Sequence, residues 1–335
     1  IDVTTIPMDD PQVISLLTSP KALGVTEDEI MCPTGTLGLP EMGTRFVINM
    51  LVETQPKSFG ELVKISGLSH GTDVWAGNAS ELIANHVCPF KEVIGCRDDI
   101  MVNLMNWGMK PIRAFKIMEF VRKGKASKDP ETWQGMAEEM RQVNIPEWYI
   151  ESCRKIKYMF PKAHAVAYVM SALRIAWFKV YHPAWYYAAY FSIRIEDFDI
   201  ESMIKGYSTI KKKIEDLTEK GFEASNKETS VLETLKAALE TTARGIQFGP
   251  IDINRSQALK FIIDDDNQTL IPPFRCIDGL GDTVANNIVA ERESKPFLSI
   301  EDLQKRAKVS QTLIDKMRMM GILNDLPESS QMTLF

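Results

Sequence analysis

Two basic side chains stand at the predicted start of a long helix. Lys162 and His164 follow Pro161, and apolar residues recur at helical spacing from Val166 to Trp177. Proline suits the first turn of a helix, where its missing N–H is not needed. That turn exposes backbone N–H groups with partial positive charge, so these residues could hold an anion such as phosphate. An ordinary helix start with solvated polar side chains fits the same residues.

A second polar stretch lies upstream. The capping-box spacing from Ser58 to Glu61 predicts a helix that ends at Gly67. Ser66, Ser69 and His70 would then border a tight polar loop whose backbone could approach a ligand closely. A simple connection between two helices is the alternative.

A third stretch is basic. The helix predicted from Pro111 carries four cations on or beside one face, with no acid before Glu119. These are Lys110, Arg113, Lys116 and Arg122. They form either a phosphate-binding surface or a solvated helix face.

Metal sites are not predicted. Asp197 and Asp199 resemble a paired-carboxylate magnesium site, but they precede an apolar helical run, where Asp is a common N-cap. His86, Cys88 and Cys96 lack the second ligand pair that a structural zinc site needs.

The C-terminal third carries a predicted helix-hairpin-helix motif. Gly279, Leu280 and Gly281 precede a helix beginning at Asp282 and Thr283, so backbone N–H groups could bind a DNA phosphate without reading bases. Lys308 and Ser310 mark a second hairpin. The preceding Pro272-Pro273 makes the first helix of the first hairpin short or absent. A plain turn is the alternative.

Composition limits the classes of protein. The chain has 335 residues and a net charge of −6, so any contact with nucleic acid must come from local basic patches. Five scattered cysteines favour a reduced, cytoplasmic protein, and no apolar run is long enough to cross a membrane. The missing initial Met suggests a fragment of a longer chain. The terminal Gln331, Leu334 and Phe335 resemble a peptide that docks into another protein.

Five stretches, in this order, resemble the PolC-type DNA polymerase III alpha subunit, a C-family replicative polymerase of Gram-positive bacteria. They are Ile65–Trp75, Val93–Ile100, Phe160–Tyr168, Gly279–Gly281 and Gln331–Phe335. The broader family has Lys-Ser-His-Ala-Ala-Ala-Tyr at the third, from which Val166 departs. The resemblance implies a C-terminal fragment and a mainly α fold. A helical fingers domain would occupy residues 1–205, whose first residues could complete the palm. A small α(+β) duplex-binding domain with helix-hairpin-helix elements would occupy 206–325, and a sliding-clamp peptide 326–335.

The resemblance also implies roles. Lys162 and His164 would bind the triphosphate of the incoming dNTP, helped by the basic cluster from Lys110 to Arg122. The stretch from Ser66 to His70 would form a wall of the nucleotide pocket. The two hairpins would bind primer–template duplex, and Gln331, Leu334 and Phe335 the beta sliding clamp, beside other replisome subunits.

The catalytic carboxylates and their Mg²⁺ ions would belong to the palm, outside this chain, so no catalytic residue is expected within it. A non-catalytic DNA-binding scaffold that recruits the clamp is the first alternative. A purely structural helical interaction protein is the second.

Overall fold

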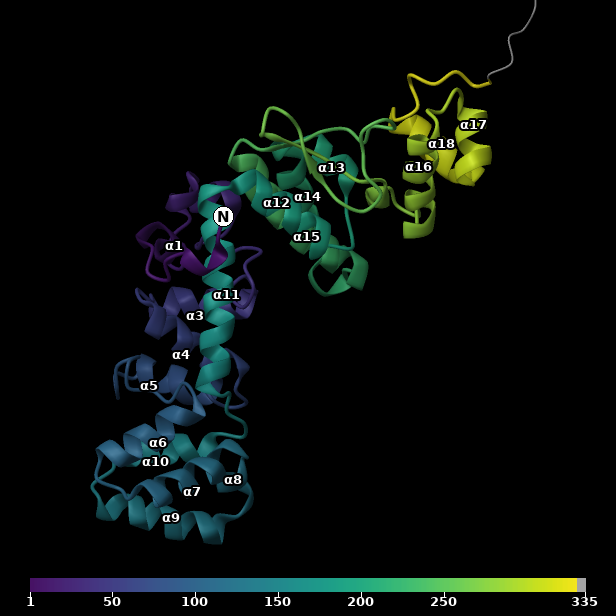
Figure 1. Ribbon diagram of the computed structural model, residues 1–335. Helices are drawn as coiled ribbons and strands as arrows, with labels where there is room; N and C mark the ends of the chain where they lie inside the picture. Colours follow the sequence, from purple (N-terminus) through teal and green to yellow (C-terminus); the bar gives the residue numbers. More distant parts are fainter. Residues whose placement is uncertain (330–335) are drawn as a thin grey trace, which may run out of the picture. The chain divides into compact units, whose positions relative to one another are not determined.

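The computed structural model describes residues 1–329 and is mainly helical, with one small sheet (Figure 1). This confirms the predicted fold class. The chain forms two compact units, one of residues 1–22 and 33–177 and the other of residues 23–32 and 178 onward. No helix within residues 1–329 combines the length and the apolar character needed to cross a lipid bilayer.

The first unit consists of short helices around one long one (Figure 1). Polar caps and prolines start several of them: Thr44, Ser58 and Asp129 accept backbone hydrogen bonds, and Pro111 and Pro130 occupy first positions. In chain order the elements are η1 (Val3–Thr5), α1 (Pro11–Ser15), η2 (Lys21–Leu23, at the unit boundary), α3 (Arg45–Thr54), α4 (Phe59–His70), η3 (Trp75–Ala79), α5 (Ser80–Ala84), α6 (Arg97–Asn106), α7 (Pro111–Arg122), α8 (Lys125–Lys128), α9 (Pro130–Gln142), α10 (Glu147–Lys155) and α11 (Lys162–Tyr181).

Helices α6 to α10 pack around a shared core (Figure 1). Ile100, Leu104, Ile117 and Val121 are fully buried where α6 meets α7. Tyr149 of α10 is also fully buried and accepts a hydrogen bond from Asn103 at 3.1 Å. This core supports the turn from which α11 starts, at the predicted residue Lys162.

The predicted end of a helix at Gly67 is wrong, because α4 continues to His70. Gly67 has a packing role within the helix: a Cβ atom there would lie 2.4 Å from both the Cys96 Sγ and the Gly95 carbonyl oxygen. The glycine therefore lets α4 approach residues 95–96 closely, and it does not end the helix. Ser66, Ser69 and His70 lie on a helix and not on a loop.

The second unit combines helices with a three-stranded sheet. Strand β3 lies between β1, to which it is parallel, and β2, to which it is antiparallel. Strands β2 and β3 flank a turn at 264–267, in which the Asn267 N–H donates to the Asp264 carbonyl at 2.9 Å. The elements are α2 (Glu27–Ile30), α12 (Pro183–Ile193), α13 (Ile200–Ile204), α14 (Tyr207–Glu219), η4 (Gly221–Glu223), α15 (Asn226–Ala243), β1 (Gln247–Phe248), β2 (Ile262–Ile263), β3 (Thr269–Ile271), η5 (Phe274–Cys276), α16 (Asp282–Ser294), α17 (Ile300–Ala307) and α18 (Gln311–Met319).

A buried polar network joins the last turn of α11, which belongs to the second unit from residue 178 on, to α12 and α15. The Lys179 ammonium lies 2.7 Å from Glu240 Oε1, and the two side chains are 0% and 1% exposed. Tyr187 donates a hydrogen bond to the same carboxylate at 2.5 Å, and Arg244 donates to the Lys179 carbonyl at 2.8 Å. Burial lowers the pKa of Lys179, while the charge of Glu240 and its hydrogen bond oppose that shift.

Candidate functional site: a basic helix start and two hairpins

The start of α11 is held by two acids from the start of α6. Asp98 accepts a hydrogen bond from the Lys162 backbone N–H at 2.8 Å, so a carboxylate already meets the positive end of α11. Asp99 Oδ1 lies 3.0 Å from the Lys162 ammonium. The other Asp99 oxygen accepts from the backbone N–H groups of Gly95 and Cys96 at 3.1 Å each. Asp99 is therefore fixed, and it orients Lys162.

Lys162 remains 53% exposed in this pair, whereas Asp99 is only 12% exposed. Partial burial alone would lower the pKa of Lys162, but the hydrogen bond and charge of Asp99 together raise it. The side chain is thus a stable cation that is oriented on one side and open to solvent on the other.

Aromatic rings bring the two predicted histidines together. Phe160 stacks on His70 with ring centres 4.8 Å apart, and it contacts His164 edge-on at 5.6 Å. His164 also lies 5.6 Å from Tyr168, one helical turn along α11. His70 Nε2 forms a hydrogen bond with the Glu41 carboxylate. The structure therefore gathers His70 with the start of α11, across a distance of about ninety residues in the sequence.

The two serines of the same helix are turned away from this cluster's surface. Ser66 is 3% exposed, and its hydroxyl has no hydrogen-bond partner among the described residues. Ser69 donates to the Ser66 carbonyl at 3.0 Å. Three side chains here were not proposed as site residues from the sequence: Phe160, Tyr168 and Glu41. Two signals were available for Tyr168, its i, i+4 spacing from His164 and its place at the end of the Phe160–Tyr168 stretch; nothing in the sequence pointed to Glu41.

Two of the four cations in the basic cluster of α7 have carboxylate partners. Arg113 forms two hydrogen bonds with Glu139 of α9, at 2.5 and 2.7 Å. Arg122 pairs with Glu119 on its own helix. Lys110 and Lys116 are exposed and form no ion pair within residues 1–329. Of the four cations, the two arginines are therefore paired with carboxylates, on α9 and on α7 respectively, and the two lysines are open to solvent.

The two hairpins of the second unit share one design. In the first, Gly279 has a φ of +85°, Leu280 is 5% exposed, and Gly281 is the N-cap of α16. In the second, Lys308 has a φ of +56°, Val309 is 3% exposed, and Ser310 is the N-cap of α18. Each hairpin thus has a residue with left-handed backbone conformation at its turn, followed by one buried apolar side chain and then by the start of a helix. This confirms the predicted second hairpin.

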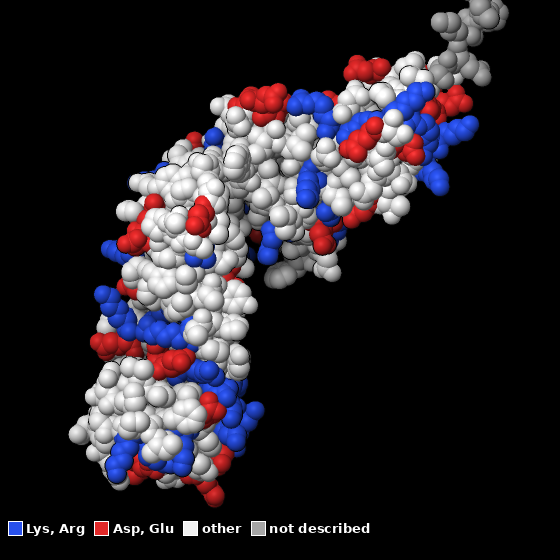
Figure 2. Space-filling model, in the orientation of Figure 1, with Lys and Arg blue, Asp and Glu red and all other residues white. Residues whose placement is uncertain are grey.

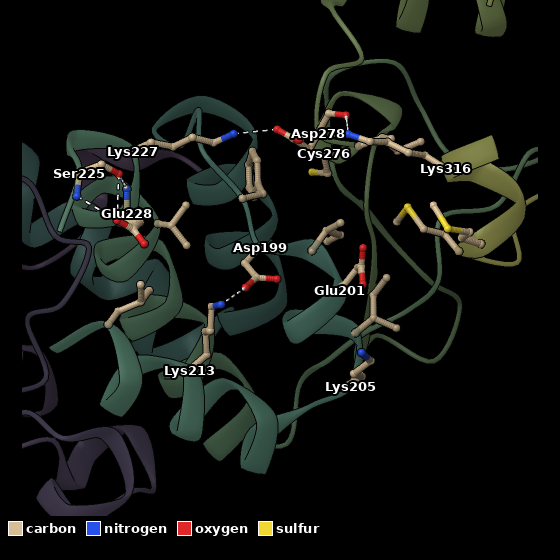
Figure 3. Close-up of a pocket in the computed structure, with 18 residues that line it drawn as sticks. Asp199, Glu201, Lys205, Lys213, Ser225, Lys227, Glu228, Cys276, Asp278 and Lys316 are labelled. Atoms are coloured by element: carbon tan, nitrogen blue, oxygen red, sulfur yellow. Dashed lines mark hydrogen bonds and ion pairs between the residues drawn. The ribbon is translucent and has the colours of Figure 1, made fainter. Parts of the chain in front are cut away.

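The remaining hairpin residues fit the same description. Asp282 and Thr283 are exposed in the first turn of α16. The short helix before the first hairpin is η5, three residues long, as Pro272-Pro273 predicted. Two lysines hold this hairpin from other elements: Lys227 of α15 lies 2.7 Å and Lys316 of α18 lies 3.1 Å from the Asp278 carboxylate. Figure 3 shows both side chains pointing toward Asp278 at the edge of a cavity of about 660 Å³.

The acids that resembled a metal site have a structural role. Asp199 is the N-cap of α13 and accepts from the Ser202 backbone N–H at 3.1 Å, which confirms the N-cap prediction. Within residues 1–329, no group of three or more His, Cys, Asp or Glu side chains could hold a metal ion. All five cysteines are buried, and none of them forms a disulfide bond within residues 1–329. Gln331, Leu334 and Phe335 lie outside the described residues.

Two family models match parts of the chain. Residues 1–144 match the bacterial DNA polymerase III alpha subunit finger domain, and residues 245–332 match the helix-hairpin-helix motif. The chain is thus similar to a polymerase finger domain in its first part and to a hairpin motif in its last part, and the start of α11 lies between the two matched ranges.

Over its whole length the chain is similar to DNA polymerases III of the PolC type. It is 57% identical to that of Bacillus subtilis, 54% to that of Lacticaseibacillus paracasei and 53% to that of Staphylococcus epidermidis, each over 335 residues. Each match covers 100% of this chain and 23% of the relative. The chain therefore spans less than a quarter of the length of these curated relatives.

Proposed function

We propose that this chain is the fingers and duplex-binding region of a replicative DNA-directed DNA polymerase, ending in a peptide that binds the beta sliding clamp. The similarity to PolC-type polymerases over all 335 residues supports this proposal. The observation that carries it is the state of Lys162, a cation oriented by Asp99 at the start of α11 yet 53% exposed.

In this proposal the incoming dNTP binds at the start of α11. Its triphosphate carries several negative charges, so it competes well with Asp98 and Asp99 for the helix N-terminus and the Lys162 ammonium. His164 supplies a second donor, and Phe160 fixes its ring together with that of His70. Lys110 and Lys116 are cations available for further phosphate contacts, whereas Arg113 and Arg122 would have to leave Glu139 and Glu119.

The chemical step belongs to the whole polymerase. The primer 3′ hydroxyl attacks the α-phosphate of the dNTP, and pyrophosphate leaves. Mg²⁺ ions support this step in such enzymes, but the described residues offer no group of ligands that fits them. We therefore assign the ions and the catalytic carboxylates to the palm, outside this chain, and expect no primer extension by these 335 residues alone.

The second unit would hold the primer–template duplex. Gly279 and Lys308 turn the two hairpins so that backbone N–H groups at the starts of α16 and α18 can meet phosphates. Such contacts do not depend on sequence, as replication requires. The clamp and other replisome subunits complete the proposed set of partners.

The test is Lys162→Ala in the full-length polymerase, with Lys212→Ala on α14 as the matched control. Lys212 is an exposed lysine with no ion pair within residues 1–329. Losing a charge-assisted contact of about 1.5–3 kcal/mol should lower kcat/KM for dNTP by about 10- to 100-fold. The control should leave it unchanged.

Steady-state incorporation of one nucleotide measures this difference. If Lys162→Ala and Lys212→Ala both behave as the unmodified enzyme, Lys162 does not bind the triphosphate. A protein that binds duplex DNA and the clamp but no dNTP would instead support the non-catalytic scaffold, which the paired hairpins alone also fit.

A further inference from the structure

The turn between α7 and α8 packs against the segment that leads into α11. A Cβ atom on Gly124 would lie 2.4 Å from the Lys157 carbonyl oxygen, so only glycine allows this approach. The Met159 backbone N–H donates to the Arg122 carbonyl at 3.4 Å. Side chains from α8 and from residues 157–158 therefore share one surface of the first unit.

This surface is rich in cations. Lys123 and Lys157 are 49% and 58% exposed, and each forms a single ion pair, with Glu119 and Asp73 respectively. Lys125 and Lys128 of α8 are exposed and form no ion pair within residues 1–329. Figure 2 shows Lys and Arg side chains gathered on the side of the first unit that carries α8 in Figure 1.

This surface has more positive than negative side chains, whereas the whole chain carries a net charge of −6. Evenly spread charges would give an acidic surface here. A cationic surface on an acidic protein indicates a polyanionic partner.

One exposed aromatic ring lies within these cations. Tyr158 is 46% exposed, and its backbone is fixed by an antiparallel bridge to Thr72, whose N–H donates to the Tyr158 carbonyl at 3.0 Å. A fixed backbone with an exposed ring provides a face on which a flat group can stack. Cations that follow a phosphate backbone, with an aromatic side chain for a base, are the combination that binds single strands.

We propose that this α8 surface, made of Lys123, Lys125, Lys128, Lys157 and Tyr158, binds single-stranded DNA: the unpaired template strand ahead of the primer end. The bases of a duplex are stacked on each other and cannot stack on Tyr158, so the ring favours an unpaired strand over a duplex. The assignment to the template rests on the proposed polymerase function.

The test uses the full-length polymerase and two primer–template DNAs that share one duplex. One has an unpaired template of about 12 nucleotides, within the range of single-strand binding sites, and the other has a template only about 2 nucleotides long. The double variant Lys125→Ala/Lys128→Ala should weaken binding of the long-template DNA about fivefold or more. It should also reduce the steepness of the salt dependence by about 0.7 for each lost phosphate contact.

Binding of the short-template DNA should not change. Tyr158→Leu, which keeps the backbone bridge and an apolar side chain, should weaken only the long-template complex. The matched control is Lys21→Ala/Lys57→Ala, two exposed lysines of the first unit that form no ion pair within residues 1–329, which should affect neither DNA. A loss that is equal for both DNAs, or no loss for either, would overturn the proposal.

The test of the α8 surface and the test of the proposed nucleotide site can fail independently of each other. The KM for dNTP on the short template reports Lys162 and should be unchanged in the α8 variants. A normal Lys162 effect with no selective loss in the α8 variants rejects the α8 surface alone. A selective loss with no Lys162 effect rejects the triphosphate site alone.

Discussion

Lys162 illustrates how the position of a residue at a helix start can be predicted while its partners cannot. The sequence placed it at the start of a helix, which the structure confirms. The two acids that hold it, Asp98 and Asp99, lie 64 and 63 residues away in the sequence, and pairing over that separation leaves no trace in local spacing. The same limit applies to Arg113, whose partner Glu139 comes from a helix that follows α7. Charge runs predict cations but not their partners.

The buried pair of Lys179 and Glu240 yields a residue-scale prediction. Lys179→Met should lower the free energy of unfolding by about 3–5 kcal/mol, because it leaves the Glu240 carboxylate buried without its cation. Adding Glu240→Leu should restore much of the loss, since the uncompensated charge is removed. Denaturant unfolding of the three proteins measures this. A double variant as unstable as Lys179→Met would show that shape, and not charge, governs the site.

Glu119 yields a pH prediction. The hydrogen bond from Arg122 lowers its pKa from 4.5 to about 2, with Lys123 acting in the same direction. A carboxyl whose pKa is lowered by folding stabilises the fold fully above the unfolded pKa. That contribution is lost as the pH falls from about 4.5 towards 2. Acid unfolding of Glu119→Gln should therefore depend less on pH in that window than unfolding of the unmodified chain. Parallel curves would refute the effect.

At the scale of elements, helices with clear periodicity and caps were predictable. The starts of α7 and α11 and the two strands β2 and β3 follow from proline, apolar spacing and turn residues. The end of α4 could not be predicted, because Gly67 looks locally like the end of a helix, whereas α4 continues to His70. Glycine stands at position 67 because α4 packs closely against residues 95–96. A contact between segments so far apart cannot be predicted from local sequence.

A matched pair of glycines in α4 tests that explanation. Gly67→Ala should lower the free energy of unfolding by about 1–3 kcal/mol, because the added methyl group meets Cys96 and the Gly95 carbonyl. Gly60→Ala has open space around its Cβ and should be neutral or stabilising by up to about 1 kcal/mol. Both variants are compared by chemical denaturation. Equal effects at the two positions would mean that helix propensity, and not packing, determines them.

At the scale of the whole molecule, the division into units depends on distant contacts. Residues 23–32 belong to the second unit, although most of that unit begins at residue 178. The Arg244 guanidinium donates to the Leu23 carbonyl at 3.1 Å, and Tyr207 donates to the Glu29 carbonyl at 2.8 Å. The sequence does not reveal that residues 23–32 belong to the second unit, because their composition does not differ from that of the residues around them. The boundary expected at residue 205 came from the family resemblance.

The proposed clamp peptide is a prediction for the full polymerase. Removing residues 331–335 should abolish stimulation by the sliding clamp, because Gln331, Leu334 and Phe335 supply the polar and apolar groups that a pocket on the clamp would bind. Distributive primer extension without the clamp should stay unchanged, since the hairpins and the start of α11 are intact. Product lengths on primed circular DNA, with and without clamp, measure both activities. Leu334→Ala/Phe335→Ala should act like the deletion, and Thr333→Ala should not. Clamp stimulation that survives the deletion would place the clamp contact elsewhere in the polymerase.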